Sequence, residues 1–315
     1  MGNRLGWKAW VMDPLERYRP IVEDYEAFRE ACRRSLSAAV RVNTIKADPE
    51  TVARAFDREG IGYERPDWTD LAFVLDTGTP GNTWPSFHGW MHGQEEVSTI
   101  PPMVLDPQPG ERVWDAAAAP GSKATQIAAA MDDRGTLVAN DNDLGRLSGL
   151  RFNAERLGVT NIVVTNRDAR NFSMNPFPFE EFDRVLVDAP CSGEGTIRKN
   201  PDALDDWSEG YLSSVAGIQK GILRRAVQAT RDGGVVVYST CTFAPEENEA
   251  VLDHALSEED CRVVDPGLPD GLEHTPGVTE WGGKSFDRSV ERAARIYPHH
   301  NDTGGFFVAK LEVGA

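Results

Sequence analysis

From residue 111 onward, segments typical of β-strands alternate with segments typical of α-helices, and this alternation constrains the fold more than any other feature. Strand-like runs lie at 112–117, 135–140, 161–166, 184–190, 235–241, 261–266 and 305–313. Helical patterns lie at 122–131, 144–158, 211–230 and 245–256. Such alternation is typical of parallel strands joined by right-handed crossovers, so the sequence predicts an open, doubly wound α/β sheet of the Rossmann-like type. Ligands in such sheets bind at the carboxyl ends of the strands.

The first hundred residues follow a different pattern. A helix is expected at 24–36 and a strand at 38–46, followed by a loop at 77–98 that is rich in Gly, Pro, Trp and His. We therefore predict a small N-terminal α/β domain at 1–100 and the doubly wound domain at 101–315. A chain of 315 residues can bury a full core without disulfides or metals.

The cysteines and the hydropathy indicate where the protein works. Cys32, Cys191, Cys241 and Cys261 lie far apart, with no CxxC pair and no histidine at ligand spacing, so a zinc site or disulfide framework is not expected. No apolar run approaches the roughly 20 residues that span a bilayer, and residues 1–10 lack a signal-peptide core. We expect a soluble, cytoplasmic monomer without a metal.

The charge is strongly negative, with 50 acidic against 33 basic residues and a net charge of −17. At low salt such a chain would repel a nucleic acid. An acidic composition with 7 Lys beside 26 Arg is also expected of a protein from a high-salt cytoplasm, where screening removes most repulsion beyond about 3 Å at 1 M salt. We favour this halophilic interpretation, so the charge does not exclude an RNA partner.

The first strand-to-helix turn reads "DAAAAPGSKATQ", from Asp115 to Gln126. It matches neither GxGxxG nor GxxxxGK[ST], which argues against nicotinamide and nucleotide-triphosphate sites. Small residues there let the backbone approach a flat ligand closely. Asp141, after the second strand, suits two ribose hydroxyls, and Asp168, after the third, suits an adenine amine. Each acid alone could be a solvated loop residue, but together they favour adenosine.

Two cysteines end strands in distinctive segments, "VDAPCSGEG" at 187–195 and "YSTCTFAPEENE" at 238–249. Together with the turn at 115–126, these segments resemble the RNA cytosine-5 methyltransferases of the Sun/Fmu type, also called the RsmB/NOP family, which include archaeal tRNA and nucleolar rRNA enzymes. The resemblance extends from "RVNTIK" at residue 41 to residue 311. Ala117 and Ser122 stand where the family usually has a cysteine and a second glycine, and neither change removes a backbone amide. Cys32 and Cys261 carry no motif and fit simple packing.

The resemblance implies a class I methyltransferase sheet that binds S-adenosylmethionine. The residues expected to hold the cofactor are Ala117, Ala118, Ala119, Pro120, Gly121, Ser122, Lys123, Asp141, Arg146, Asp168 and Asp188.

Two thiols suit covalent methylation of cytosine. Addition of a thiolate at carbon 6 makes carbon 5 nucleophilic, and the adduct must then lose a proton and eliminate the sulfur. By resemblance, Cys241 is the nucleophile and Cys191 assists release. DNA cytosine methylases use a Pro-Cys cysteine for attack, so the residues alone leave the order open. Asp188 could bind the Watson–Crick edge of an extruded base, and Lys123 could lower a thiol pKa.

RNA contacts are expected at Arg198 and Lys199 and then at Arg41 and Lys46. Trp84, Phe87 and Trp90 could stack on unpaired bases or pack within their loop. His299 and His300 are expected to line the approach to the last strand rather than to act in catalysis.

The sequence thus predicts methylation of tRNA or rRNA, with tRNA favoured, and the N-terminal region at 1–100 is expected to recognise the RNA. Two alternatives remain open, namely a methyltransferase acting on a non-RNA substrate and a non-catalytic RNA-binding or assembly factor.

Overall fold

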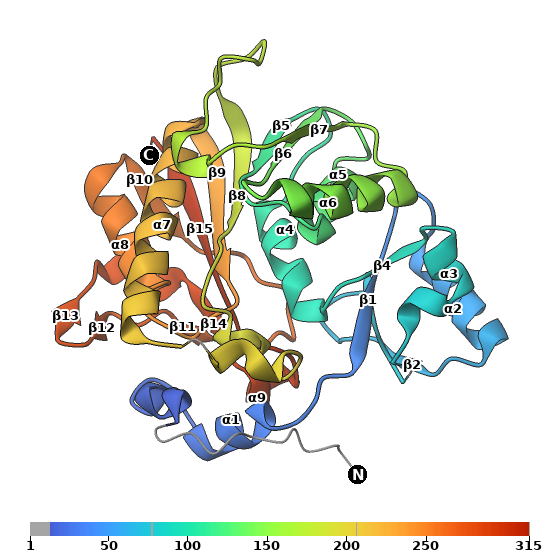
Figure 1. The fold of residues 1–315 in the computed structure, drawn as a ribbon, viewed down its shortest axis with the longest axis horizontal. Helices are drawn as coiled ribbons and strands as arrows, with labels where there is room; N and C mark the ends of the chain where they lie inside the picture. The colour runs from blue at the N-terminus through green and yellow to red at the C-terminus, as the bar shows by residue number, and fades with distance from the viewer. Residues whose placement is uncertain (1–12, 77, 206, 315) are drawn as a thin grey trace.

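The structure is a computed structural model, and it describes residues 13–76, 78–205 and 207–314. A small four-stranded sheet and a large nine-stranded sheet form its framework (Figure 1). The segment at 1–10, expected to lack a signal-peptide core, lies outside the described residues.

The small sheet has the strand order β2-β3-β1-β4 and is antiparallel in its β1–β3, β1–β4 and β2–β3 pairings. Helix α2 begins after Asp48, whose side chain accepts a hydrogen bond from the Thr51 amide, and ends at Gly60 in the left-handed conformation. Phe56 of α2 packs against Phe73 of β3, which fixes the helix on the sheet. The elements of this region are β1 (Ala38–Val42), α2 (Pro49–Glu59), β2 (Tyr63–Glu64), β3 (Ala72–Leu75), η2 (Pro80–Asn82), α3 (Trp84–Phe87), β4 (Met91–Gly93) and η3 (Glu96–Thr99).

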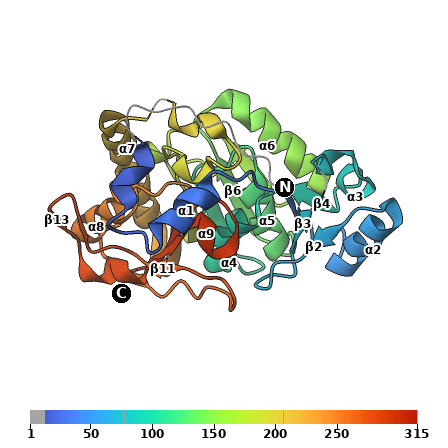
Figure 2. The same cartoon turned by 90° about the horizontal axis from the view of Figure 1, so that it is seen from below.

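The segment before the small sheet packs elsewhere. It contains η1 (Pro14–Tyr18) and α1 (Tyr25–Cys32). The Phe28 ring lies 5.0 Å from the Phe243 ring and 5.8 Å from the Tyr297 ring, measured between centroids. Figure 2 shows α1 beside α9 (Pro298–Asn301). Residues 15–32 therefore share a core with residues from the second half of the chain.

The large sheet has the order β7-β6-β5-β8-β9-β15-β14-β11, and β10 also pairs with β15. The pairings from β7 through β9 are parallel. The strands are β5 (Arg112–Asp115), β6 (Thr136–Asn140), β7 (Ile162–Thr165), β8 (Phe182–Asp188), β9 (Thr230–Thr240), β10 (Cys261–Val264), β11 (Thr275–Pro276), β14 (Ala294–Ile296) and β15 (Phe306–Val313), and β12 (Glu280–Trp281) and β13 (Lys284–Ser285) form a separate ribbon.

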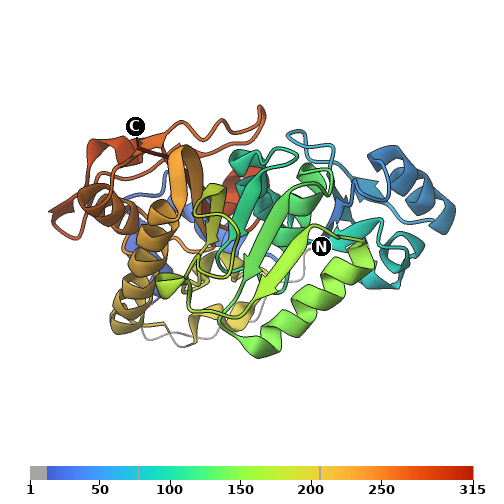
Figure 3. The ribbon, with the colours of Figure 1, turned by 90° about the horizontal axis from the view of Figure 1, so that it is seen from above.

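Helices cover both faces of this sheet, as a doubly wound fold requires. One core joins the sheet to α7 and α8, and another joins it to α4, α5 and α6. Figures 1 and 3 show α7 and α6 on opposite sides of the strands. These helices are α4 (Ile100–Leu105), α5 (Ser122–Ala130), α6 (Leu144–Leu157), α7 (Glu209–Gln228) and α8 (Glu249–Glu258), with short η4 (Ala169–Asn171), η5 (Glu194–Thr196), η6 (Pro201–Leu204) and η7 (Arg288–Arg292) between or after them.

The predicted fold class is confirmed, with one correction to the strand directions. Strand β15 runs antiparallel to β9, β10 and β14, so the sheet is mixed rather than wholly parallel. For the β14–β15 pair, the reason is the length of the connection. Only residues 297–305 separate β14 from β15, whereas a crossover between parallel strands needs a dozen or more residues.

Candidate active site

A cavity of about 290 Å³ lies where the carboxyl ends of the parallel strands meet. Both motif cysteines reach it, together with residues of the turns that follow β5, β6, β7 and β8. Its lining comprises Ala116, Ala117, Ala119, Asn140, Asp141, Asn142, Arg146, Arg167, Asp168, Ala169, Arg170, Asp188, Ala189, Pro190, Cys191, Ile218, Ile222 and Cys241. The structure thus brings the two thiols together with the three acids predicted to bind adenosine or a base.

The two thiols are neighbours. The Sγ atoms of Cys191 and Cys241 lie 3.3 Å apart, although 50 residues separate them in the chain. The hydrogen bond with Cys241 raises the pKa of the Cys191 thiol well above its usual value, and burial adds to the effect. Cys191 follows β8 and Cys241 follows β9, and these strands are parallel neighbours, so their ends deliver both thiols to one point.

The turns that carry the cysteines are bonded to each other. The Gly195 amide donates to the Cys241 carbonyl oxygen over 2.9 Å, and the hydroxyl oxygens of Ser192 and Thr242 lie 2.8 Å apart. A β-carbon on Gly195 would lie 2.3 Å from the Gly305 carbonyl oxygen, so only glycine permits this approach. The spacing of the thiols therefore depends on packing between the turns.

An ion pair stands beside the thiols. Lys123 Nζ lies 2.8 Å from Asp188 Oδ2 and donates to Ser98 Oγ over 2.9 Å. The other Asp188 oxygen accepts from Ser239 Oγ over 2.9 Å. Burial lowers the pKa of Lys123, but the charge of Asp188, its hydrogen bond and the charges of Cys241 and Asp115 together outweigh burial and raise the lysine pKa. Lys123 and Asp188, which the sequence analysis assigned separate roles, thus form an ion pair at the junction of α5, β8 and β9.

The turn after β5 is held by Asp141. One Asp141 oxygen accepts from the Ala119 amide over 3.2 Å, and the other accepts from the Asp143 amide over 2.9 Å. Arg146 lies 3.4 Å from the Asp141 carboxylate and also donates to the Ala119 carbonyl oxygen. Gly121 has φ +107, and it precedes α5 where the helix packs against Leu150. The Ala119 backbone, the Asp141 carboxylate and the Arg146 guanidinium thus meet at one wall of the cavity.

Asp168 lies at the cavity too, but its carboxylate already has a partner. It forms an ion pair with Arg170 at 2.6 Å and caps η4 through the Arg170 amide. These hydrogen bonds from Arg170 lower the pKa of Asp168. An adenine amine would share this carboxylate with Arg170.

Asp115, at the end of β5, is a buried carboxylate that the sequence analysis did not assign. It has no exposed surface, and neither oxygen makes a hydrogen bond of normal geometry within the described residues. Burial, helped by the charge of Asp188, raises its pKa to about 8. Its position at the end of the first strand of the doubly wound sheet was the sequence signal that could have marked it as a site residue. An unpaired buried carboxylate beside a cavity fits a ligand that carries positive charge, as S-adenosylmethionine does.

The structure corrects two of the predicted RNA contacts. Arg41 is 1% exposed and donates to Gln94, Thr125 and backbone oxygens inside the protein. Arg198 is 3% exposed and donates to the Arg34 and Thr303 carbonyl oxygens and to Asp302. Both guanidinium groups therefore donate to acceptors inside the protein and connect distant segments of the chain. A buried arginine is tolerated when its donors find acceptors.

The other predicted RNA residues lie on the surface. Lys46 is exposed and donates to the Arg156 carbonyl oxygen over 2.7 Å, and Lys199 is exposed at the end of the Cys191 turn. Trp84 and Phe87 of α3 are 62% and 76% exposed, whereas Trp90 is half-buried and stacks on His88. Their contact with RNA stays a prediction.

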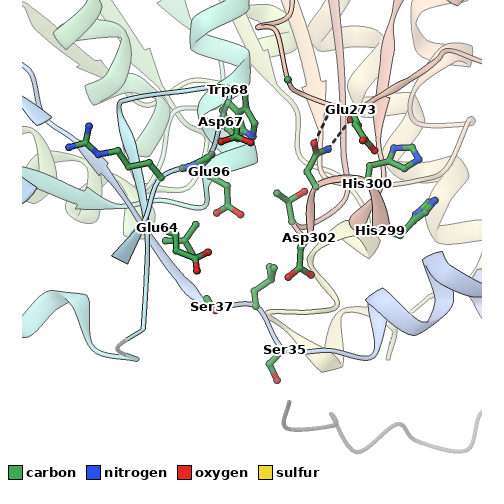
Figure 4. Close-up of a pocket in the computed structure, with 17 residues that line it drawn as sticks. Ser35, Ser37, Glu64, Asp67, Trp68, Glu96, Glu273, His299, His300 and Asp302 are labelled. Atoms are coloured by element: carbon green, nitrogen blue, oxygen red, sulfur yellow. Dashed lines mark hydrogen bonds between the residues drawn. The ribbon is translucent and has the colours of Figure 1, made fainter. Parts of the chain in front are cut away.

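A second cavity, of about 510 Å³, lies between the small sheet and the segment before β15 (Figure 4). His299 and His300, of α9, belong to the lining of this cavity and not to the lining of the cavity that holds the thiols. Its carboxylates belong to Glu64, Asp67, Glu96, Glu273 and Asp302. Such an excess of negative charge repels phosphate, so this cavity does not suit an RNA backbone.

Across residues 13–76, 78–205 and 207–314, no group of three or more His, Cys, Asp or Glu side chains could hold a metal ion. In the same part of the chain, no helix has the length and apolar character needed to cross a membrane.

Comparison with known proteins gives a consistent result. A family model described as 16S rRNA methyltransferase RsmB/F matches residues 102–312. The tRNA (cytosine(49)-C(5))-methyltransferase of Pyrococcus abyssi is 37% identical over 300 residues, which cover 94% of each chain. The ribosomal RNA small subunit methyltransferase F of Shewanella loihica is 36% identical over 294 residues, and this alignment covers 91% of the present chain but 58% of that protein.

Two solved structures share the fold. A methyltransferase homolog protein from Pyrococcus horikoshii superposes with a TM-score of 0.83 at 32% identity, covering 95% of this chain and 93% of that one. The structure of NSun6 from Pyrococcus horikoshii with SFG gives a TM-score of 0.80 at 21% identity, covering 96% and 97% of the two chains.

Proposed function

We propose that this chain acts on a cytosine of tRNA through a covalent cysteine adduct. The chain belongs to the 16S rRNA methyltransferase RsmB/F family and is an S-adenosylmethionine-dependent RNA cytosine-5 methyltransferase. The observation that carries the covalent step is the pair of thiols 3.3 Å apart in the cavity at the strand ends. The tRNA assignment is supported by the similarity to the Pyrococcus abyssi tRNA enzyme over 94% of both chains.

The cofactor fits the wall built by the turns after β5 and β6. S-adenosylmethionine supplies the methyl group. Ala117, Ala119 and Asp141 offer small side chains and a carboxylate acceptor for adenosine, and Arg146, which also lines the cavity, donates to the Ala119 carbonyl oxygen of this turn. Asp115, whose carboxyl makes no hydrogen bond of normal geometry within the described residues and has a pKa raised by burial to about 8, would lose its proton more readily beside a positively charged ligand. Asp168, which lines the same cavity and is paired with Arg170, would bind the adenine end of the cofactor.

The reaction itself requires the thiols and the ion pair. Cys241 Sγ, as thiolate, bonds to carbon 6 of the cytosine, and the electrons of the C5–C6 double bond become available at carbon 5. After carbon 5 has gained its methyl group, a base removes the carbon 5 proton, the double bond re-forms, and the bond from carbon 6 to Cys241 breaks. Cys191 assists this release. Asp188, held by Lys123, accepts a hydrogen bond from the extruded base.

Ribosomal RNA is the second candidate substrate, because the relative from Shewanella loihica is a ribosomal RNA methyltransferase. Incubation of the protein with unmodified tRNA and with 16S rRNA, followed by bisulfite sequencing, separates the two. We expect a protected cytosine in tRNA. Protection in rRNA alone would replace the tRNA assignment, and protection in neither would contradict the proposed activity.

The roles of the two thiols are tested by trapping. Cys241→Ala should abolish methylation and leave no covalent species, because no sulfur is available to add. Cys191→Ala should still add to the base and methylate it, but release should stall. We therefore expect a protein–RNA adduct that survives denaturing electrophoresis and disappears on RNase treatment. Trapping by Cys241→Ala alone would reverse the roles, and activity in both variants without trapping would exclude the covalent mechanism.

The strongly acidic composition supports a further part of the proposal, namely that the protein works as a monomer in a cytoplasm of high salt, where screening lets it approach RNA.

A further inference from the structure

Glu247 lies against the Cys191 turn. It belongs to the turn between β9 and α8 and has no exposed surface. One carboxylate oxygen accepts from the Ser192 amide over 2.9 Å and from Gln219 Nε2 over 2.9 Å. Gln219, from α7, also donates to the Pro190 carbonyl oxygen over 2.8 Å. The residues on both sides of Cys191 are therefore fixed by one carboxylate and one amide.

Anchoring alone does not explain why this side chain is a carboxylate. Its second oxygen, Oε1, is buried without a hydrogen-bond partner in the described residues. A buried polar atom without a partner costs free energy. A glutamine side chain has one carbonyl oxygen that could accept from both Ser192 and Gln219, and it would bring no charge into the interior.

The two thiols face different charged groups. Cys241 interacts electrostatically with Lys123, which is paired with Asp188. Cys191 interacts with Cys241 and with the Glu247 carboxylate. Tyr238, whose hydroxyl donates to the Glu247 carbonyl oxygen, stays neutral because burial raises its pKa well above the usual value. The Lys123–Asp188 ion pair therefore stands on the Cys241 side, and the Glu247 carboxylate stands on the Cys191 side.

We propose that Glu247 is a positioning residue that distinguishes the two thiols: it fixes the turn at 190–192 and places a carboxylate on the Cys191 side of the thiol pair, so that Cys191 assists release and does not compete with Cys241 as the nucleophile. This inference rests on the proposed covalent mechanism. A neutral Cys191 does not compete with Cys241 for carbon 6 and remains available for release of the adduct. The Cys191 pKa agrees in direction, since it is raised by the bond with Cys241, by burial and by the charges of Cys241 and Glu247.

Site-resolved alkylation of the free protein tests this inference without RNA. Iodoacetamide reacts with thiolates, and peptide mass spectrometry reports Cys191 and Cys241 separately. In Glu247→Gln the turn keeps its acceptor but loses the charge, so the Cys191 pKa should fall. We expect alkylation of Cys191 at pH 8 to rise about tenfold, the effect of a shift of one pKa unit. Cys241 should change less, and the Cys191 rate profile should move to lower pH.

Glu246→Gln is the matched control. Glu246 precedes Glu247 in the same turn, but its carboxylate faces Arg17 and Trp281. This variant should leave the Cys191 profile unchanged. Equal shifts in both variants, or an unshifted profile in a folded Glu247→Gln protein, would overturn the inference, because a purely structural anchor has no effect on the pH dependence.

A second variant keeps the test decisive if Glu247→Gln does not fold. Gln219→Met removes one hydrogen bond that stabilises the Glu247 carboxylate, whose pKa burial already raises to about 7. More Glu247 is then protonated near pH 7, so Cys191 alkylation should rise at pH 7 and not at pH 9. An equal rise at both values would indicate simple exposure and overturn the inference. A profile that shifts as expected in a protein that methylates no RNA would leave the inference standing while the proposed function fails.

Discussion

Asp141 connects the turn after β5 with the turn after β6 through bonds to the Ala119 and Asp143 amides. We expect Asp141→Ala to weaken S-adenosylmethionine binding at least tenfold, because hydrogen bonds to a charged acceptor are worth roughly 1.5 to 3 kcal/mol each. Calorimetric titration measures the affinity. Asp143→Asn is the control, since asparagine preserves the cap of α6. Unchanged affinity in a folded Asp141→Ala protein would remove this residue from the cofactor site.

Asp115 makes stability depend on pH. Its pKa in the folded protein is about 8, raised first by burial, whereas an aspartate in an unfolded chain titrates near 4. Between these values the native state binds the extra proton, so rising pH lowers the free energy of unfolding, by at most about 1.4 kcal/mol per pH unit from this group. Below about pH 4 both states are protonated, and above about pH 8 neither is.

Asp115→Asn should remove that slope. The variant should gain stability relative to the unmodified protein as pH rises from 5 to 8, and thermal unfolding at several pH values reports the difference. Parallel curves for the two proteins would show that Asp115 does not carry the raised pKa. Saturating S-adenosylmethionine should reduce the difference at pH 8, because a positively charged ligand compensates the ionised carboxylate.

At the scale of elements, the approach of the two cysteine turns depends on Gly195. An alanine there would place its β-carbon 2.3 Å from the Gly305 carbonyl oxygen and 2.9 Å from that of Cys241. Gly195→Ala should therefore separate the turns, lower the melting temperature and reduce kcat more than cofactor affinity. Gly217→Ala, in α7, is the control, since its β-carbon would meet nothing within 4 Å and alanine favours a helix by about 1 kcal/mol. Equal activity in both variants would show that the thiols need no close packing of the turns.

The elements were predictable where local pattern decides structure. The helix expected at 122–131 is α5 (Ser122–Ala130), and that expected at 144–158 is α6 (Leu144–Leu157), which an Asp cap begins and a left-handed glycine ends. The antiparallel pairing of β14 with β15 was not predictable from alternation, because it depends on a connection too short for a crossover. The site was predictable as a set of strand ends, since parallel strands deliver their carboxyl ends to one edge.

Other features depend on tertiary contacts that carry no local signal. Arg41 and Arg198 look like surface cations in sequence, but acceptors from distant segments bury them. The partner of Asp168 is two residues away, yet only the fold shows that Arg170 occupies it. Glu247 lies inside the Cys241 segment at 238–249, and only its hydrogen bond to the Ser192 amide shows that it faces the turn that carries Cys191.

The net charge of −17 sets a condition for folding of the whole protein. If the acidic surface is matched to high salt, stability and methylation should rise between 0.1 M and about 2 M KCl, because salt screens repulsion between carboxylates. The buried pair of Arg295 and Glu249 should contribute little to this rise, because both side chains are shielded from solvent. Calorimetric melting and tRNA methylation rates, measured across the same salt series, test the expectation.

A charge-reduced variant separates screening from general salting-out. Asp70→Asn, Glu155→Gln, Glu180→Gln and Glu258→Gln together remove four negative charges from exposed positions outside the cysteine cavity. The combined variant should be more stable than the unmodified protein at 0.1 M KCl and should gain less from added salt, whereas salting-out would raise both equally. Affinity for RNA should change in the opposite direction and fall as salt rises, because the release of counterions becomes less favourable. A steady fall of both stability and RNA binding from 0.1 M upward would contradict the high-salt account and leave the acidic composition without this explanation.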